Sequence, residues 1–105
     1  MLSRHVQPVD ELVEVLDARA DALEENHKNL LRDLCKMRID HGLTQEVVAE
    51  RMGVTQPSVS QFERYDANPT LDTVRRYAMA VGARLSTTVI DDTDKDPRSR
   101  GGVPI

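Results

Sequence analysis

The apolar side chains of the first forty residues fall on one face of a helix. They recur every seven positions, with further apolar residues four positions later: Val9, Val13, Leu16, Ala20, Leu23, Leu30, Leu34 and Met37. Spacings of three and four residues place side chains on the same side of an α-helix. The pattern therefore predicts helical structure that begins after Pro8 and ends near residue 40.

Two helical arrangements fit this segment. Either one helix runs over about 9–40, or an acidic helix over 9–27 ends at a break and a second helix begins at about residue 28. The break is favoured near Asn26–His27, because the polar residues 24–27 interrupt the apolar face together. A continuous arm of coiled-coil type is the alternative. Residues 1–8 show no pattern and are expected to form a tail.

Three short helices are predicted between residues 44 and 82. Each begins after a threonine whose hydroxyl can accept a hydrogen bond from the first turn: Thr44, Thr55 and Thr70. Gly42 follows the preceding helical segment, Gly53 follows the first short helix and Gly82 follows the last, and each can take the left-handed conformation of a helix end. The helices are expected over 45–52, about 56–64 and about 71–81. Their inward-facing residues are expected to be Val47, Val48, Met52, Val59, Phe62, Leu71, Val74, Tyr77, Ala78 and Val81.

The period of the pattern changes after Gly82. Residues 84–90 alternate between polar and apolar and are rich in β-branched side chains, which predicts a strand over 83–91. A single strand leaves its backbone unpaired, so the simplest partner is the same strand of a second copy. Residues 92–105 are charged and contain Gly and Pro, and we expect them to be disordered. The expected fold is all-α, with four or five helices over 28–82, an N-terminal helical extension and a C-terminal dimerisation strand.

Composition limits the classes of protein to which the chain can belong. At 105 residues it has room for one domain. The single cysteine, Cys35, cannot form an internal disulfide. No apolar run is long enough for a membrane span or a signal peptide. The chain is therefore expected to be cytoplasmic and without a membrane partner.

The charge is distributed unevenly along the chain. The net charge of −4 is unusual for a protein that binds nucleic acid, but residues 10–25 alone carry −6, whereas residues 26–90 carry +2. The acidity thus lies outside the segment with the three short helices. A low overall charge predicts weak non-specific binding to DNA.

No catalytic, metal or cofactor site is expected. Cys35 lies eight residues from His27 and six from His41, and neither spacing brings a histidine onto the thiol within a helix. One cysteine and three scattered histidines do not supply a zinc site. The sequence also contains no glycine-rich phosphate loop. We therefore expect that the protein is not an enzyme.

Residues 44–63 suit two helices that cross closely. Ala49 is small enough for a close contact, and Gly53 can adopt the positive φ of a tight turn. The second helix leaves Gln56, Ser58 and Gln61 on its outer face. These uncharged side chains donate and accept hydrogen bonds, as base edges in the major groove require, whereas a merely solvated face would usually carry Lys and Glu. The alternative is a plain helical corner with no binding role.

The stretch from about Leu30 to Val81 resembles helix-turn-helix regulators of the phage repressor and Cro type, the xenobiotic-response-element family. The residues that carry the resemblance are Gly42, Leu43, Thr44, Gln45, Ala49, Gly53, Val54, Thr55, Gln56, Val59, Ser60, Pro69, Thr70 and Leu71. It implies a repressor-like domain that binds an inverted-repeat operator in double-stranded DNA as a homodimer.

The resemblance also implies a role for individual residues. The expected base contacts come from Thr55, Gln56, Pro57 and Gln61. The expected contacts with the DNA backbone come from Thr44, Gln45, Ser58, Ser60 and Arg64. Gln45 is also expected to brace the recognition helix. Arg38 and Glu63 occupy the positions of an ion pair in phage repressors, and we expect it to be structural.

The strand-like ending departs from the family pattern, because many members have a fifth helix there. This ending is similar to antitoxins of the host-inhibition type, which bind their own promoter as dimers and also hold an RNase toxin. The acidic extension would then bind a small basic toxin, since opposite charges steer association. A solvated helix face is the alternative. Three functions remain open: a regulator alone, an antitoxin that also represses its own operon, and a helix-turn-helix used only for protein contacts.

Overall fold

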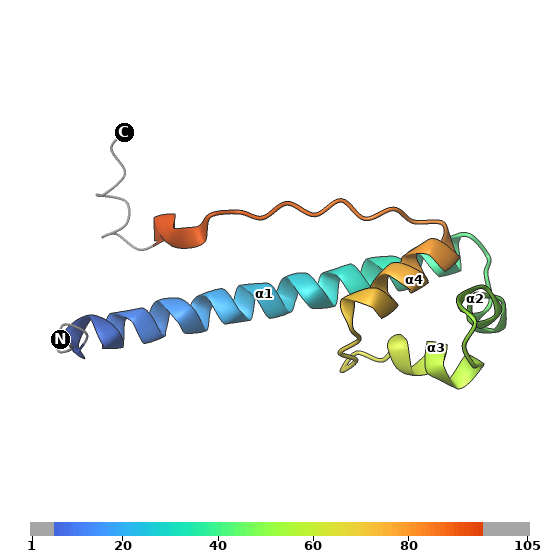
Figure 1. Cartoon of the computed structure of the whole chain (residues 1–105), viewed down its shortest axis with the longest axis horizontal. Coiled ribbons are helices and arrows are strands. Elements are labelled where there is room, and N and C mark those ends of the chain that lie inside the picture. The colour runs from blue at the N-terminus through green and yellow to red at the C-terminus, as the bar shows by residue number, and fades with distance from the viewer. Residues whose placement is uncertain (1–5, 96–105) are drawn as a thin grey trace. The chain divides into compact units, whose positions relative to one another are not determined.

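The described part of the chain folds into four α-helices, labelled in Figure 1. The computed structural model describes residues 6–95. The elements are α1 (Val6–Asp40), α2 (Gln45–Met52), α3 (Gln56–Phe62), α4 (Leu71–Val81) and the short 3-10 helix η2 (Asp92–Lys95). Within these described residues there is no strand, so the predicted all-α class is confirmed.

The described chain divides into two compact units. One comprises residues 26–87 and contains the second part of α1 with α2, α3 and α4. The other combines residues 6–25 with residues 88–95. In the first unit the three short helices gather beside the C-terminal end of α1, as Figure 1 shows. This unit holds the buried core and the candidate site.

The expected break near Asn26–His27 is wrong, because α1 continues through it for 35 residues. The polar residues 24–27 lie on exposed or half-buried positions, where they cost the helix only their modest intrinsic propensities. Neither Gly nor Pro occurs there to stop the helix. Residues 6–8, expected in the tail, are also helical, and Pro8 is tolerated because it lies in the first turn. Residues 1–5 of that tail lie outside the described residues.

Hydrogen bonds cap all three short helices as predicted. The hydroxyls of Thr44, Thr55 and Thr70 accept from backbone N–H groups three residues later. Gly53 and Gly82 take the left-handed conformation with φ of 74° and 86°, in which an L side chain would be strained. Helix α3 ends at Phe62, two residues earlier than expected.

The core lies where α2, α3 and α4 meet the second part of α1. Its buried residues are Leu31, Leu34, Val48, Ala49, Met52, Val59, Phe62, Val74, Tyr77, Ala78, Ala80 and Val81. The rings of Phe62 and Tyr77 stack with centroids 4.2 Å apart and join α3 to α4. Leu71 was expected in this core, but it is 72 % exposed. It is the first residue of α4 and precedes Val74, where the buried side of this helix begins.

Residues 83–91 have no regular secondary structure in this single chain. Leu85 packs against the core, whereas Val89 and Ile90 are exposed. The start of the predicted disordered tail is ordered instead: residues 92–95 form η2, and the carboxylate of Asp92 pairs with Arg19 at 3.1 Å. Residues 96–105 of that tail lie outside the described residues.

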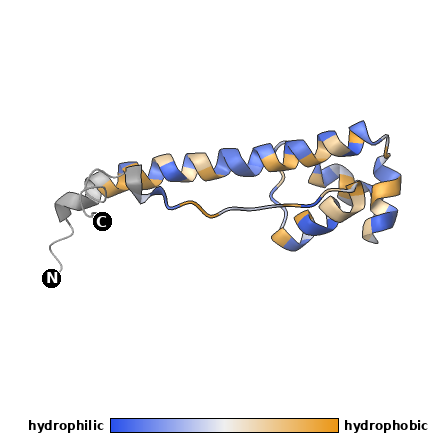
Figure 2. Ribbon diagram, turned by 90° about the horizontal axis from the view of Figure 1, so that it is seen from above, coloured by the Kyte–Doolittle hydropathy of each residue, from blue (hydrophilic) through white to orange (hydrophobic). Residues whose placement is uncertain are grey.

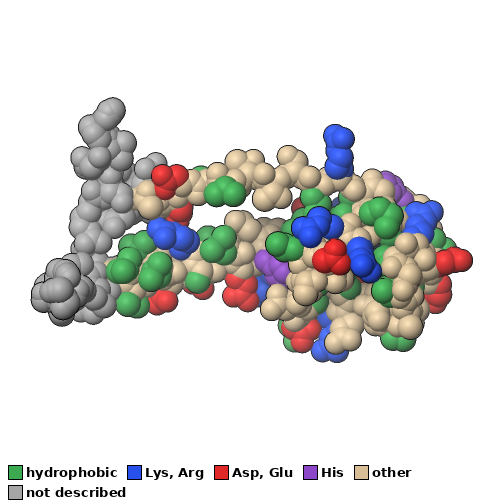
Figure 3. Space-filling view, in the orientation of Figure 1, with side chains coloured by type: hydrophobic (Ala, Val, Ile, Leu, Met, Phe, Trp, Pro, Cys, Tyr) green, Lys and Arg blue, Asp and Glu red, His purple; other side chains and the backbone are tan. Residues whose placement is uncertain are grey.

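The N-terminal part of α1 carries an uncovered apolar face. Leu12, Val13, Leu16 and Leu23 are each more than 40 % exposed. Figure 3 shows hydrophobic side chains in green at the surface of the described part of the chain, and Figure 2 shows how apolar and polar positions alternate along α1. Despite this face, no helix in the described part of the chain is long and apolar enough to cross a membrane.

Ala49 tests the close packing of the helix-turn-helix. It is 4 % exposed, so the larger side chain of Ala49→Leu has no space and should lower the free energy of unfolding by about 1–3 kcal/mol. Urea denaturation followed by circular dichroism measures this change. The matched control is Ala20→Leu on the exposed surface of α1, which should change stability by less than about 0.5 kcal/mol. Equal stability of the two variants would show that α2 does not need a small residue there.

Candidate nucleic-acid interface

Helix α3 presents a polar outer face beside α2. Val59 and Phe62 turn inward to the core, so the remaining positions of this short helix turn outward. Pro57, Ser58, Ser60 and Gln61 are exposed, and Gln56 is half-buried at the start of the helix. A face of this kind has hydrogen-bonding groups without strong charge, which suits contact with base edges.

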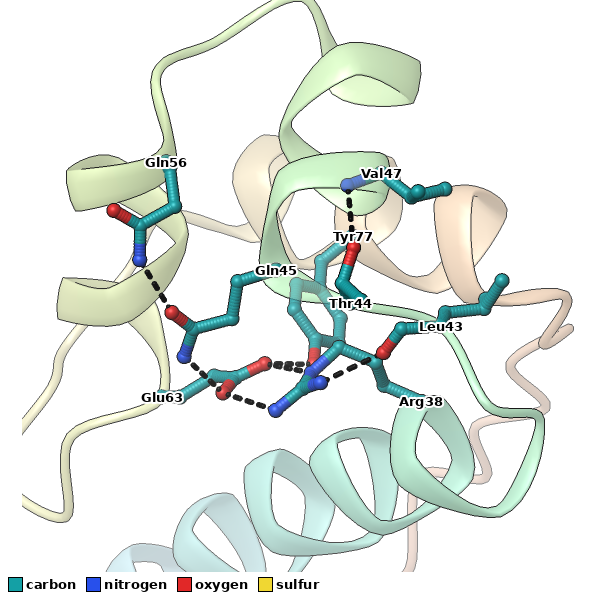
Figure 4. Close-up of polar contacts among 8 residues, drawn as sticks. All are labelled: Arg38, Leu43, Thr44, Gln45, Val47, Gln56, Glu63 and Tyr77. Atoms are coloured by element: carbon teal, nitrogen blue, oxygen red, sulfur yellow. Dashed lines mark hydrogen bonds and ion pairs between the residues drawn. The ribbon is translucent and has the colours of Figure 1, made fainter.

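The carboxylate of Glu63 is the centre of the polar contacts behind this face. It is the C-cap residue that follows α3, and its side chain is only 7 % exposed. Arg38 of α1 binds it at two points, with Nε–Oε2 at 2.6 Å and a second nitrogen–Oε1 distance of 3.0 Å. The hydroxyl of Tyr77 donates to Oε2 at 2.5 Å. Glu63 therefore joins α1, α3 and α4, as Figure 4 shows.

A third donor connects Glu63 to the outer face. Nε2 of Gln45, the first residue of α2, donates to Glu63 Oε1 at 2.9 Å. The carbonyl oxygen of Gln45 in turn accepts from Nε2 of Gln56 at 2.5 Å (Figure 4). An ionised carboxylate only accepts hydrogen bonds, so Gln45 must direct its amide nitrogen to Glu63 and its oxygen to Gln56. The chain Glu63–Gln45–Gln56 thus fixes the orientation of both amides.

The ionisation of Glu63 is stabilised by these contacts. Burial alone would raise the pKa of its carboxyl group, but the hydrogen bonds from Arg38, Tyr77 and Gln45 outweigh burial and lower the pKa below its ordinary value. The pKa of Tyr77 is raised by burial and by its hydrogen bond to Glu63. The pKa of Arg38 is raised mainly by its hydrogen bond to Glu63. All three groups therefore keep their usual charge at neutral pH.

Arg38 has a further contact that positions the start of α2. Its remaining nitrogen donates to the backbone carbonyl of Leu43 at 2.7 Å, in the turn between α1 and α2. The residues that the resemblance pairs, Arg38 and Glu63, thus lie in direct contact, and the arginine is also bonded to the turn. The side chains of Arg38 and Glu63 are 14 % and 7 % exposed in this contact, which leaves them little surface for DNA.

Several of the predicted DNA-contacting hydroxyls already serve as helix caps. Thr44 accepts from the backbone N–H of Val47, and Thr55 accepts from that of Ser58. The hydroxyls of Thr55 and Ser58 also lie 2.9 Å apart and share a hydrogen bond. Arg64, expected at the DNA backbone, is exposed but pairs with Asp66 at 3.1 Å. A phosphate would have to compete with that carboxylate.

Tyr77 and the link between Gln45 and Glu63 were missed by reasoning from the sequence. Tyr77 was expected only as part of an apolar face. A signal was available, because a tyrosine hydroxyl in a buried stripe needs a hydrogen-bonding partner. Gln45 was expected at the DNA backbone and as a brace for the recognition helix. Its hydrogen bond with Gln56 of α3 agrees with the brace, but nothing in the sequence pattern connects it with Glu63.

The histidines and the cysteine are engaged in the fold. A ring nitrogen of His41 lies 2.8 Å from the carbonyl oxygen of Val81, and one of His27 lies 3.4 Å from that of Ala67. Burial and the neighbouring Glu63 raise the pKa of the Cys35 thiol, which favours its neutral form. Among the described residues there is no cluster of three or more His, Cys, Asp or Glu that could hold a metal ion.

Comparison with known proteins identifies the fold around this site. A family model described as helix-turn-helix matches residues 36–86. An uncharacterised HTH-type transcriptional regulator, y4dJ of Sinorhizobium fredii, is 35 % identical over 65 residues, which cover 62 % of this chain and 83 % of that protein. The chain belongs to the helix-turn-helix family. The prediction from the sequence, a helix-turn-helix regulator of the repressor and Cro type, is therefore confirmed at the level of the family.

A second relative is similar over little more than half of this chain. Antitoxin HigA1 of Mycobacterium tuberculosis, found in two strains, is 46 % identical over 61 residues, which cover 58 % of this chain. The chain spans 41 % of the length of that antitoxin. No solved structure matches the chain. The helix-turn-helix is a DNA-binding domain, and the two relatives are named as an antitoxin and as a transcriptional regulator.

Glu63→Gln tests the charge at the centre of the site. The amide keeps the shape of the side chain but leaves Arg38 without its counter-charge, so the free energy of unfolding at pH 7 should fall by about 2–4 kcal/mol. The lowered pKa of Glu63 means that its stabilisation is complete above the ordinary pKa of a glutamate and is lost as the pH falls through the folded-state value. Denaturation series at several pH values measure both effects.

Asp66→Asn is the control for this experiment. In the parent protein the pKa of Asp66 is also lowered, by a hydrogen bond from Arg64. Its carboxylate is exposed to solvent, however, and should contribute little to stability. The free energies of unfolding of the Glu63→Gln and Asp66→Asn proteins should differ most at pH 7 and converge in acid. A Glu63→Gln protein as stable as the parent at pH 7 would contradict the role given to this carboxylate.

Proposed function

We propose that the protein is a sequence-specific transcriptional repressor that binds an inverted-repeat operator as a homodimer. The observation that carries this proposal is the outer face of α3, where the amide of Gln56 is held in place by the chain from Glu63 through Gln45. The membership in the helix-turn-helix family supports the same function. In a two-fold dimer the two α3 helices would enter successive major grooves about 34 Å apart. The proposed site of action is the cytoplasm, where the chromosome is accessible.

The fixed amide of Gln56 supports a preference for adenine. One of its two N–H groups is given to Gln45, so one N–H and the carbonyl oxygen remain for DNA. Adenine offers one acceptor and one donor in the major groove, which match this pair, whereas guanine offers two acceptors. Gln61, exposed one turn further along α3, is proposed as the second base contact, with Thr55 and Pro57 beside it.

The segment 83–91 is proposed as the dimerisation strand. Its backbone has no partner strand within the described single chain, and Val89 and Ile90 are exposed. Pairing with the same segment of a second copy would satisfy the backbone groups and cover these side chains. This would also explain the β-branched composition of a segment that has no regular structure in isolation.

Gln56→Ala tests the base contact. Loss of a two-point contact should weaken binding to the preferred operator by about 1–3 kcal/mol and leave binding to random DNA nearly unchanged. The operator is first obtained by selection of bound sequences from random DNA, and fluorescence anisotropy then gives the affinities. Equal losses on the operator and on random DNA would show that Gln56 is not a base contact.

Arg64→Ala is the matched comparison, because Arg64 is proposed to contact the DNA backbone. Here the affinity for all sequences should fall together, and the dependence of affinity on salt should become shallower by about one unit of slope. If this variant loses affinity only for the operator, the two roles have been assigned the wrong way round.

Thr88→Pro tests the strand. Proline cannot donate to a β-ladder, so this change should weaken the dimer and reduce operator affinity, while the helical content stays the same. Sedimentation velocity measures the oligomeric state. Thr93→Pro in η2 lies outside the proposed strand and serves as the control, which should remain dimeric. A dimer that Thr88→Pro does not weaken would place the interface elsewhere.

A second candidate function is an antitoxin that also represses its own operon. It is supported by the likeness to HigA1 and by the exposed apolar residues of α1, which are flanked by the acids Glu14, Asp17 and Asp21. A small basic protein with an apolar surface would fit such a face. Co-expression with the protein encoded next to it decides between the functions. A complex that Leu16→Glu disrupts favours the antitoxin, and the absence of a complex favours a regulator alone.

A further inference from the structure

A half-enclosed groove of about 440 Å³ lies on the second part of α1, beside the residues that follow α3. Its apolar lining comes from Leu31, Cys35, Ile39 and Tyr65. Ile39 and Tyr65 are 60 % and 89 % exposed, which is unusual for large apolar or aromatic side chains. The volume lies within the range of small-molecule sites in proteins, about 300–1,000 Å³. The groove belongs entirely to the unit of residues 26–87.

The edge of the groove is basic. Lys28, Arg32 and Lys36 line it at intervals of four residues, so they form a row on one side of α1. The acid that lines the groove, Glu63, already has its charge matched by Arg38. Lys36 is bonded to Asp40 on the surface, and Arg32 donates to the side-chain oxygen of Asn29. The combination of an apolar lining with a basic edge suits a ligand with an apolar body and an anionic head group.

We propose that this groove binds a small amphipathic anion, an alkyl or aryl carboxylate, and that binding raises the affinity of the domain for its operator. The apolar body would lie on Leu31 and Ile39, under Tyr65, and the carboxylate would meet Arg32 and its neighbours. The effect on DNA rests on the function proposed above, whereas the binding of the ligand does not.

Glu63 connects the groove with α3. The same carboxylate that lines the groove accepts hydrogen bonds from Arg38, Tyr77 and Gln45, and Gln45 holds Gln56. An apolar ligand body excludes water from the outer side of Glu63, and charged hydrogen bonds are stronger where water is excluded. A firmer Gln45 holds the Gln56 amide in its DNA-binding orientation. We expect operator affinity to rise about fivefold, at the low end of usual coupling factors.

The first experiment measures binding without DNA. Decanoate, below the concentration at which it forms micelles, is titrated into the full chain by isothermal calorimetry. Arg32→Glu should weaken its binding about tenfold, because the charge that meets the head group is reversed. Arg75→Glu on the exposed side of α4 makes the same charge change elsewhere and should have no effect. Equal binding by the Arg32→Glu and parent proteins would overturn the site.

A second variant excludes adsorption to the uncovered apolar face of α1. Leu16→Glu places a charge on that face and should leave decanoate binding unchanged. If Leu16→Glu abolishes binding and Arg32→Glu does not, decanoate binds the N-terminal part of α1 and the proposed groove is wrong.

The last experiment measures the coupling. Operator affinity is determined with and without saturating decanoate for the parent protein and for Gln45→Ala, which breaks the chain between Glu63 and Gln56. The parent should bind the operator about fivefold more tightly with decanoate. Gln45→Ala should bind the operator more weakly, still bind decanoate, and show no change on its addition. Binding of decanoate that leaves the parent's operator affinity unchanged would overturn the regulatory role. A parent protein that selects no operator even without decanoate would instead contradict the proposed repressor.

Discussion

The arrangement of the helix-turn-helix depends on one carboxylate kept ionised at the end of α3. Glu63 is nearly buried, and an isolated buried charge would be expelled or protonated. It is retained because Arg38 binds it at two points and Tyr77 and Gln45 donate to it. Each donor comes from a different helix, so satisfying this one group fixes how α1, α2 and α4 meet α3. A buried ion pair adds little net stability over an apolar pair of the same shape, but its directional bonds allow only one geometry.

That geometry extends to the surface because hydrogen bonds have polarity. A carboxylate cannot donate, so the amide of Gln45 has only one orientation against Glu63, and the amide of Gln56 then has only one orientation against Gln45. The groups that Gln56 presents at the surface, where we propose that it contacts DNA, are thus decided by Glu63 inside the domain. A base-contacting side chain that is already oriented loses less conformational freedom on binding than a free glutamine would.

The local elements were predictable from the sequence because their signals are local. Thr44, Thr55 and Thr70 cap helices with their own hydroxyls, and Gly53 and Gly82 end them at positive φ. The break in α1 was predicted wrongly. Where the apolar face is interrupted, the side chains stop packing against a core, but the backbone hydrogen bonds of the helix continue. Polar residues without Gly or Pro continue a helix at small cost. Leu71 was misplaced because periodicity does not show where a helix passes beyond the edge of its core.

The site was predictable only in part, since its contacts join residues that are far apart in the chain. The pairing of Arg38 with Glu63 followed from family resemblance, and no periodicity would have indicated it. The links from Glu63 to Gln45 and Tyr77 span 18 and 14 residues and need the folded arrangement. The order at residues 92–95 was unpredictable for the same reason, because Asp92 pairs with Arg19, which is 73 residues away.

The charge distribution explains why such precision in the amides would matter to this protein. Residues 26–90 carry a net charge of only +2, so attraction to phosphates alone gives weak binding to any one DNA site. Arg64, the cation nearest the end of α3, is already paired with Asp66. In the proposed repressor, affinity would then come from oriented hydrogen bonds to bases and from engagement of two half-sites at once, which raises the effective concentration of the second domain. A domain with little electrostatic affinity binds random DNA weakly. In the proposed repressor, its affinity for the operator would then depend on whether the Gln56 amide is held in its orientation.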